Sequence, residues 1–382
     1  MTKISLPAPA LSLALSLAML FIMAPSCRSG ADSDRSGAAG DTLTRHTRFL
    51  TLTDRDGWIE ADFQNPWQEG AGYGRLALIE RDAPMPALPA GITPVRVPLE
   101  RSVVTQAVHM GAIEELGALD RVTGVADAAF ITLPSVKKRL AEGTMANCGI
   151  ATEPSIERII EADADAILMS PYADSDHSAL RKMKIPVIEM ADYMETTPEA
   201  RAEWLRLLGI LYGRRAEADS TFSRSMAEYT RLKNLAAATS ERPKVLTEQL
   251  TSGVWYVPGA QSYMARLITD AGARHPFTRY NTTGSAPLDL AAVIDLASDA
   301  DIWLLKTFGT PVSLQSLETE CQLYSSFKAW QQGNVYVADT KKTHLYEEFP
   351  FHPERLLAEY ILIFHPELAS DLPEARYYHR IQ

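Results

Sequence analysis

The sequence predicts an α/β protein with two similar lobes joined by one long helix. Short, almost continuous apolar strands alternate with helices in residues 95–195, and the same alternation returns in residues 243–382. Between them lies a helical stretch, residues 196–238. Because apolar strands separated by helices are typical of a parallel sheet covered on both faces, we expect one such sheet in each lobe. A rigid connection between two lobes implies a cleft.

The connecting stretch has clear helix signals. Thr197 followed by Pro198 is a favourable helix start, since the threonine side chain caps the first turn and proline is tolerated there. Gly209 or Gly213 predicts a break, after which apolar residues recur at helical spacing. A helix from Arg214 to Ala238 would be about 37 Å long, longer than a small domain is wide.

Composition limits the class of function. The chain has 382 residues, enough for more than one core, with 46% hydrophobic residues and a net charge of −11. This charge, and the absence of a run of Lys and Arg, argue against nucleic acid as a partner. The sequence contains no GxSxG, P-loop, HExxH or CxxC motif, so we expect a binding protein rather than an enzyme.

The first residues predict export. Lys3 precedes a short apolar run, residues 11–23, which is followed by small residues and Cys27. This resembles a bacterial lipoprotein signal (residues 1–27) with Cys27 as the lipidated N-terminus, although Pro25 departs from the usual pattern; simple secretion is the alternative. We expect an extracytoplasmic protein anchored to a membrane, in a leaflet that the sequence leaves open, with a flexible tether at residues 28–45.

Two cysteines remain after such processing, Cys148 and Cys321. They fall in different lobes, so a disulfide would lock the cleft. We prefer two unpaired thiols.

Residues 46–94 predict a small β extension. Two or three strands are expected around an Asp56–Gly57 turn, followed by a linker rich in proline. We assign it no chemistry.

The lobes contain the following expected elements. In the first lobe, strands are expected at 101–105, 122–125, 166–170 and 186–190, with helices at 106–116, 135–142 and 156–161. In the second lobe, strands are expected at 244–248, 254–257, 302–306 and 335–338, with helices at 262–271, 290–297, 325–331 and 353–364.

Several segments in this order resemble a known family. They include PLERSVVTQAVHMGAIEELGALDRVTGVAD (98–127), EPSIERIIEADADAILMSPY (153–172), WYVPGAQSYMARLITDAGA (255–273), LDLAAVIDLASDADIWLL (288–305) and HPERLLAEYILIFHPEL (352–368). With the connecting helix, this order is similar to the Fe/B12-type (class III) periplasmic substrate-binding proteins of ABC importers. The extension at 46–94 is not part of the family pattern.

The resemblance implies two Rossmann-like lobes and a monomer that needs no cofactor. It implies a ferric siderophore, haem or cobalamin as the transported ligand, and an ABC permease with its ATPase as partners. A two-lobe, exported chelatase-like enzyme acting on a tetrapyrrole or metal is the alternative.

A ligand between such lobes should touch the loops at the carboxyl ends of the strands. Candidate ligand-binding residues in the first lobe are Thr105, Gln106, His109, Asp127, Phe130, Tyr172 and Tyr193. Those in the second lobe are Glu248, Gln249, Trp255, Tyr256, Lys306, Phe308, Lys341, His344 and Tyr346. A direct metal site would require convergence of His109, Glu248, His344 and Tyr346, which the sequence leaves open. We interpret His352 and His365 as capping or packing residues.

The resemblance also implies permease docking through one acidic residue on each lobe. In the first lobe, the segment that matches the family motif is SIERII, and the position of the acidic residue in it is Glu157. In the second lobe the expected position is Ala291, a departure from the family, and Asp289 or Asp295 is the substitute we consider.

Overall fold

The computed structural model describes residues 40–173 and 178–382. The signal peptide, Cys27 and most of the expected tether lie outside these residues. No helix within the described ranges is long and apolar enough to cross a membrane. Both cysteines that we expected to be unpaired are free thiols. Cys148 is buried and Cys321 is partly exposed.

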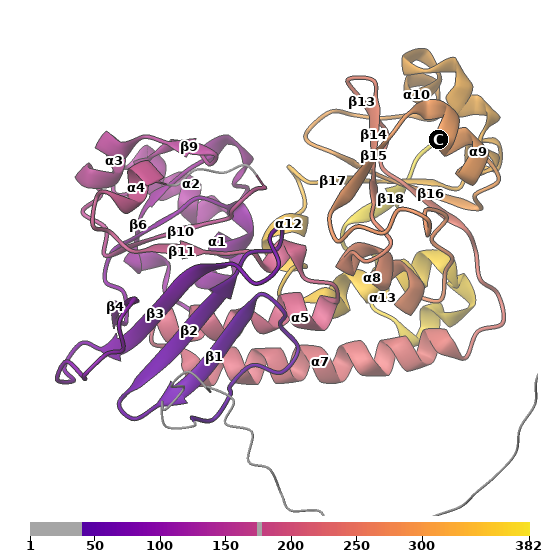
Figure 1. Cartoon of the computed structure of the whole chain (residues 1–382). Coiled ribbons are helices and arrows are strands. Elements are labelled where there is room, and N and C mark those ends of the chain that lie inside the picture. Colours follow the sequence, from indigo (N-terminus) through magenta and orange to yellow (C-terminus); the bar gives the residue numbers. More distant parts are fainter. Residues whose placement is uncertain (1–39, 174–177) are drawn as a thin grey trace, which may run out of the picture. The chain divides into compact units, whose positions relative to one another are not determined.

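The N-terminal extension is one four-stranded sheet, which we call the extension sheet (Figure 1). Its strands lie in the order β1 (Leu50–Arg55), β2 (Trp58–Gln64), β3 (Gly72–Glu80) and β4 (Ile92–Val97). The first three are antiparallel, with the expected turn at Gly57 in the left-handed region, and β4 returns parallel to β3. The expected linker therefore ends in a further strand.

The end of the expected flexible tether is fixed. Thr42 forms a β-bridge with Thr53, and the Leu43 N–H donates to the Leu52 carbonyl at 2.8 Å. These backbone bonds satisfy part of the edge of β1, so residues 41–43 belong to the extension sheet rather than to a tether.

The first lobe is built on the expected parallel sheet. Its strand order is β11-β10-β5-β6-β7, and every pairing is parallel. The strands are β5 (Ser102–Val104), β6 (Val122–Val125), β7 (Ala146–Asn147), β10 (Ala166–Met169) and β11 (Val187–Glu189). The helices are α1 (Ala107–Glu115), α2 (Pro134–Ala141), α3 (Ile156–Glu161) and α4 (Ser178–Arg181), and a small hairpin pairs β8 (Gly149–Ile150) with β9 (Glu153–Pro154). Among these strands and α-helices, β7, α4 and the strands of this hairpin were not predicted.

The connecting stretch forms three helices, α5 (Pro198–Glu203), α6 (Leu205–Leu211) and α7 (Arg215–Ala237). Thr197 caps α5 through a 3.1 Å bond from the Ala200 N–H. The chain turns at Gly213, whose φ of 69° and close approach to Pro98 disfavour any side chain.

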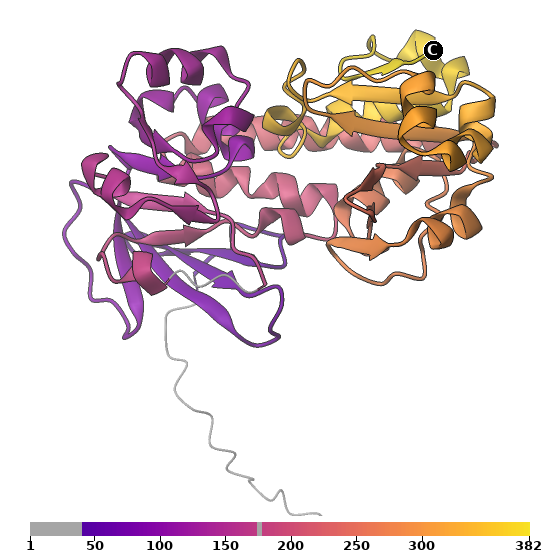
Figure 2. The ribbon, with the colours of Figure 1, turned by 90° about the horizontal axis from the view of Figure 1, so that it is seen from above.

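Helix α7 contributes to the cores of both lobes. Ala218 is buried in the core that includes the first lobe and the extension, whereas Tyr229, Leu232 and Ala236 are buried in the core of the second. Figures 1 and 2 show this helix running along both lobes. The predicted single long connection is confirmed.

The second lobe contains two sheets. The first sheet has the strand order β12-β16-β17-β18. It contains three parallel strands, β12 (Val245–Thr247), β16 (Ile302–Thr307) and β17 (Val335–Asp339). The edge strand β18 (Tyr378–Arg380) pairs antiparallel with β17. A separate antiparallel sheet holds β13 (Leu250–Thr251), β14 (Val254–Pro258) and β15 (Ser285–Leu288). The helices are α8 (Tyr263–Asp270), α9 (Leu290–Ala297), α10 (Leu314–Glu320), α11 (Lys328–Gln331), α12 (Leu345–Glu348) and α13 (Pro353–Phe364).

The predicted fold class is confirmed, with local corrections. The expected helix at 325–331 is split into a 3₁₀ turn (Gln322–Ser326) and the short α11. Helices α10 and α12 and strand β18 were not predicted, because each is short and lacks a periodic apolar pattern.

The two lobes contact each other where α1 meets α12. A Cβ at Gly111 of α1 would lie 2.0 Å from the Glu347 carbonyl oxygen, so only glycine permits this approach. The Thr132 N–H and hydroxyl donate to the Glu347 carboxylate at 2.7 and 2.6 Å. Beside them, His352 Nε2 lies 2.6 Å from Glu115 of the first lobe.

This histidine gives a pH-dependent prediction. Burial alone would lower the pKa of His352, but its bonds to the Glu115 and Glu354 carboxylates outweigh burial and raise that pKa to about 9. Because the folded-state pKa is above the ordinary value, the stabilisation is complete below about pH 6.5 and is lost as the pH rises through about 9. We expect His352→Gln to remove about 1–3 kcal/mol of unfolding free energy at pH 6 and much less at pH 9.5.

Urea unfolding of wild type and variant across this pH range measures the difference. The exposed His379→Gln is the matched control and should track wild type. A His352→Gln curve parallel to that of wild type at all pH values would contradict the assignment.

Candidate ligand-binding site

A cavity of about 420 Å³ opens beside the carboxyl ends of the second-lobe strands. Its lining is dominated by tyrosines, and one of them, Tyr193, comes from the first lobe. The tyrosines are Tyr193, Tyr256, Tyr263, Tyr346, Tyr360 and Tyr378. Such a lining offers flat apolar faces together with hydroxyl groups.

A wider groove of about 980 Å³ continues from this cavity. The two share Tyr193, Thr283, Gly284 and Ser285 in their linings. The groove is also lined by the first lobe, including Tyr172, and by the extension, through Arg48, Phe49, Pro66 and Trp67. The cavity and groove therefore form one continuous site between the lobes.

A paired lysine and glutamate supply the charges of the cavity. Glu248 directly follows β12 with a left-handed backbone (φ 65°), and its carboxylate forms an ion pair with Lys306 on β16. Burial opposes the charge of Lys306, but the Glu248 carboxylate outweighs this and raises the pKa of Lys306. Lys306 therefore keeps its positive charge at neutral pH, and the Lys306–Glu248 ion pair adds no net formal charge to the cavity.

Three of the lining tyrosines, Tyr193, Tyr346 and Tyr360, remain neutral. Burial raises the pKa of Tyr346 and of Tyr193, and raises that of Tyr360 to about 12. At physiological pH these groups are phenols that can donate hydrogen bonds. Tyr193 donates to the Pro171 carbonyl at 2.6 Å, which fixes its ring at the junction of cavity and groove.

The structure brings several of the predicted residues into this site. They are Tyr172, Tyr193, Glu248, Gln249, Tyr256, Lys306 and Tyr346. Gln106 lies behind them and donates to the Tyr172 hydroxyl at 3.2 Å.

Other candidates lie elsewhere. Phe130 and Phe308 face each other across the lobes, with ring centroids 5.2 Å apart, and the Lys341 ammonium lies 5.8 Å from the Phe308 ring. Asp127 occupies a left-handed turn before a 3₁₀ helix, Ala128–Phe130. His344 Nδ1 lies 2.6 Å from the Thr132 hydroxyl.

Thr105 and His109 are fully buried and do not reach the cavity. His109 Nε2 lies 2.9 Å from the Asp192 carboxylate, which also accepts a 2.9 Å bond from Arg201. This buried network holds α1 against the start of the connecting helices. The expected role of His109 at the ligand is therefore replaced by a packing role.

The predicted position of Trp255 at the ligand also needs correction. Its side chain is 0% exposed and packs against Trp303, Tyr324 and Phe327, with ring centroids 5.8–6.0 Å away. Because side chains alternate along a strand, the next residue, Tyr256, points the opposite way and is 49% exposed in the cavity.

Sequence reasoning missed several aromatic residues that line the cavity or the groove. Tyr263 and Tyr360 lie on helices, Tyr378 lies on β18, and Trp67 lies in the extension. The turn NPWQEG, which places a tryptophan among turn formers, was the available signal for Trp67.

The described residues contain no group of three or more His, Cys, Asp or Glu side chains able to hold a metal ion. The convergence of His109 and His344 with Glu248, which the sequence left open, does not occur, because the two histidines contact Asp192 and Thr132 instead. Tyr346 and Glu248 do share the cavity.

The docking candidates are on the surface. Glu157 is exposed on α3, next to the exposed Ile156 and Ile160, and Ser155 caps this helix. Asp289 is exposed but serves as the N-cap of α9, accepting the Ala292 N–H at 2.7 Å.

The alternation on β14 generates a paired prediction. Trp255→Ala should lower the free energy of unfolding by about 3–5 kcal/mol, because it empties the centre of an aromatic core. Tyr256→Ala, its neighbour, should change stability by less than about 1 kcal/mol. Urea unfolding measures both, and equal losses would contradict the opposite orientation of the two side chains.

Comparison with known proteins agrees with this architecture. The family model described as periplasmic binding protein matches residues 103–341. An uncharacterized lipoprotein of Methanocaldococcus jannaschii is 26% identical over 278 residues; the match covers 69% of this chain and 66% of that protein, slightly less than two thirds of its length.

Solved structures share the fold. A periplasmic heme-binding protein from Pseudomonas aeruginosa superposes with a TM-score of 0.59 at 15% identity, covering 74% of this chain and 98% of its own. A protein of an ABC-type Fe3+-hydroxamate transport system from Saccharomonospora viridis superposes with a TM-score of 0.57 at 18% identity, covering 70% of this chain and 94% of its own. The periplasmic vitamin B12-binding protein of Vibrio cholerae superposes with a TM-score of 0.53 at 12% identity, covering 72% of this chain and 98% of its own.

These matches confirm the resemblance predicted from the sequence. The chain belongs to the periplasmic binding protein family and has the two-lobe fold of its Fe/B12 type.

Proposed function

We propose that this protein captures an iron chelate (a siderophore or haem) or cobalamin between its lobes and delivers it to an ABC permease. The observation that supports this most strongly is the tyrosine-rich site with walls from both lobes. Neutral phenol rings suit a large conjugated chelate, since they bury apolar area and still offer hydrogen-bond donors.

The connection between the lobes supports small movements during capture. Helix α7 is buried in both cores, so wide opening would expose apolar surface at one of its ends. We expect modest closure on the ligand rather than a large hinge rotation.

We also propose that the protein is an exported, extracytoplasmic lipoprotein, anchored to a membrane through lipid at Cys27. The lipoprotein signal in the sequence supports this, as does the similarity to an archaeal lipoprotein. The partner would be a permease with its ATPase.

Binding of defined chelates by the purified protein tests the proposal. Haemin, ferrichrome and cyanocobalamin represent the three ligand classes, and we expect at least one to bind with a Kd of about 1 µM or lower, about −8 kcal/mol. Tyr256→Ala should weaken that binding about tenfold, because an exposed ring in the cavity is lost.

Calorimetry or absorbance titration measures these affinities. Leu323→Ala, an exposed apolar side chain of the second lobe outside the cavity lining, is the control and should bind as wild type does. Failure of the wild-type protein to bind any of the three compounds would refute the proposed function.

Docking on a permease gives a separate prediction. Glu157→Arg should reduce uptake in cells strongly while ligand affinity stays unchanged, because α3 is outside the cavity lining and like charges at an interface cost several kcal/mol. Asp289→Arg or Asp295→Arg should have a smaller effect, since the family position in the second lobe is Ala291. Normal uptake by Glu157→Arg would remove it from the docking surface, and equal defects at all three sites would contradict the asymmetry.

A further inference from the structure

We propose that the extension sheet forms a third wall of the ligand site, in which Trp67 stacks on a flat conjugated face of the ligand and Arg48 binds an anionic group. This inference rests on the proposed function and adds to it a segment that lies outside the family pattern. It predicts a planar ligand that carries carboxylates.

Trp67 lies at the tip of the turn between β2 and β3. The Asn65 side chain accepts the Trp67 N–H at 2.9 Å, and the Asn65 N–H donates to the Ala71 carbonyl at 2.9 Å. These bonds close the turn and hold the tryptophan backbone in one place. The indole is thus presented by an ordered turn.

The indole continues an aromatic row across the groove. Its ring centroid lies 6.5 Å from that of Tyr193, and Tyr193 lies 6.3 Å from Tyr172. The three rings come from the extension, from the end of β11 and from the end of β10, and all three line the groove. Trp67 and Tyr172 remain 36% and 40% exposed, so both rings keep accessible surface in the groove.

Arg48 gives the groove its charge. Among the described residues that line the groove, it is the one with a formal charge, and it is exposed. Within the described ranges its guanidinium has no carboxylate partner; it lies over the Phe49 ring, 5.4 Å from the centroid. An unpaired cation beside an aromatic row favours a ligand that combines a flat ring with an anion.

Two buried carboxylates fix the backbone around Arg48. Glu195 accepts the N–H groups of Arg48 and Phe49 at 3.0–3.1 Å. Glu203, on α5, accepts those of Arg45, His46 and Thr47 at 2.7–3.2 Å. The segment that carries Arg48 is therefore attached directly to the connecting helices.

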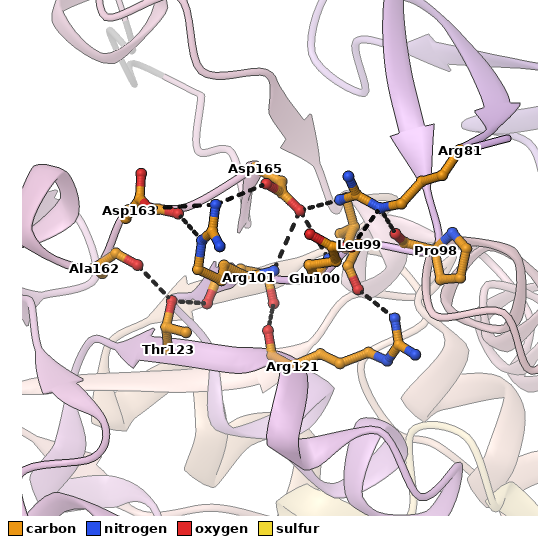
Figure 3. Close-up of polar contacts among 11 residues, drawn as sticks. Arg81, Pro98, Leu99, Glu100, Arg101, Arg121, Thr123, Ala162, Asp163 and Asp165 are labelled. Carbon is orange, nitrogen blue, oxygen red and sulfur yellow. Dashed lines mark hydrogen bonds and ion pairs between the residues drawn. The ribbon is translucent and has the colours of Figure 1, made fainter.

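The extension sheet is also fixed to the first lobe, near the end of β3 (Figure 3). Arg81 forms an ion pair with Asp165 and donates to the Pro98 carbonyl at 2.7 Å. Asp165 in turn accepts the Glu100 N–H at 2.8 Å. Because the sheet is held at both places, its wall is preorganised and little ordering is needed when a ligand binds.

Haemin tests the aromatic contact, because it is planar, conjugated and carries carboxylates. Absorbance titration of the full chain should show that Trp67→Ala weakens haemin binding about tenfold or more, and that Trp67→Phe weakens it less. Trp58→Phe is the matched control, since Trp58 belongs to the same sheet at the opposite end of β2 and lines neither the cavity nor the groove.

Haemin dimethyl ester, in which both carboxylates are blocked, tests the charge. Arg48→Ala should weaken binding of haemin several-fold and leave binding of the ester nearly unchanged. Arg48→Lys should retain part of the preference for haemin over its ester. Arg45→Ala removes a neighbouring exposed arginine outside the lining and should match wild type for both compounds.

The outcomes separate the two proposals. Wild-type binding of ferrichrome or cyanocobalamin without haemin would retain the function and overturn this inference. Haemin binding that is unchanged in Trp67→Ala and Arg48→Ala would also overturn it, as would equal losses in the Trp58 and Arg45 controls. Binding of none of the compounds would refute the function and this inference together.

Discussion

The burial of one helix in two cores is the constraint on which the rest of the structure depends. The apolar face of α7 begins at Ala218 in the first-lobe core and continues to Tyr229, Leu232 and Ala236 in the second. Neither core is complete without it, so the separation of the lobes is set by helix length. The α1–α12 contact at Gly111 then fixes how closely the lobes approach on one side, and the open side is where the cavity and the groove meet.

The fold could be predicted from the sequence because its signals are local. The capping by Thr197, the turn at Gly213 and the short apolar strands each depend on a few neighbouring residues, and the bounds of α3, α9 and α13 follow from them. β4 and β18 could not be predicted in the same way. Each is a strand only because a distant strand supplies its hydrogen-bond partner, and nothing in its own residues specifies that partner.

Part of the candidate site could be predicted because strand ends determine it. Glu248, Lys306 and Tyr193 follow or end parallel strands, and they converge as that rule requires. His109 and Trp255 are instead buried outside the cavity lining, because the sequence did not show which way each side chain points and a buried partner, Asp192 or Trp303, was available to each. Tyr360 and Trp67 were missed because long-range packing of α13 and of the extension sheet brings them to the site.

The charge distribution of the site bears on release as well as capture. In the cavity, the Lys306–Glu248 pair is internally neutralised, so a ligand held there would depend mainly on buried apolar area and hydrogen bonds, whereas Arg48 supplies a charge in the groove. Contacts of this kind weaken progressively as two walls separate, in contrast to a metal–ligand bond. A small displacement of one lobe would therefore withdraw Tyr193 and the extension wall from the ligand while the second-lobe tyrosines still held it. For the proposed capture and delivery, such a displacement would reduce the contact area on the ligand without a large change of shape.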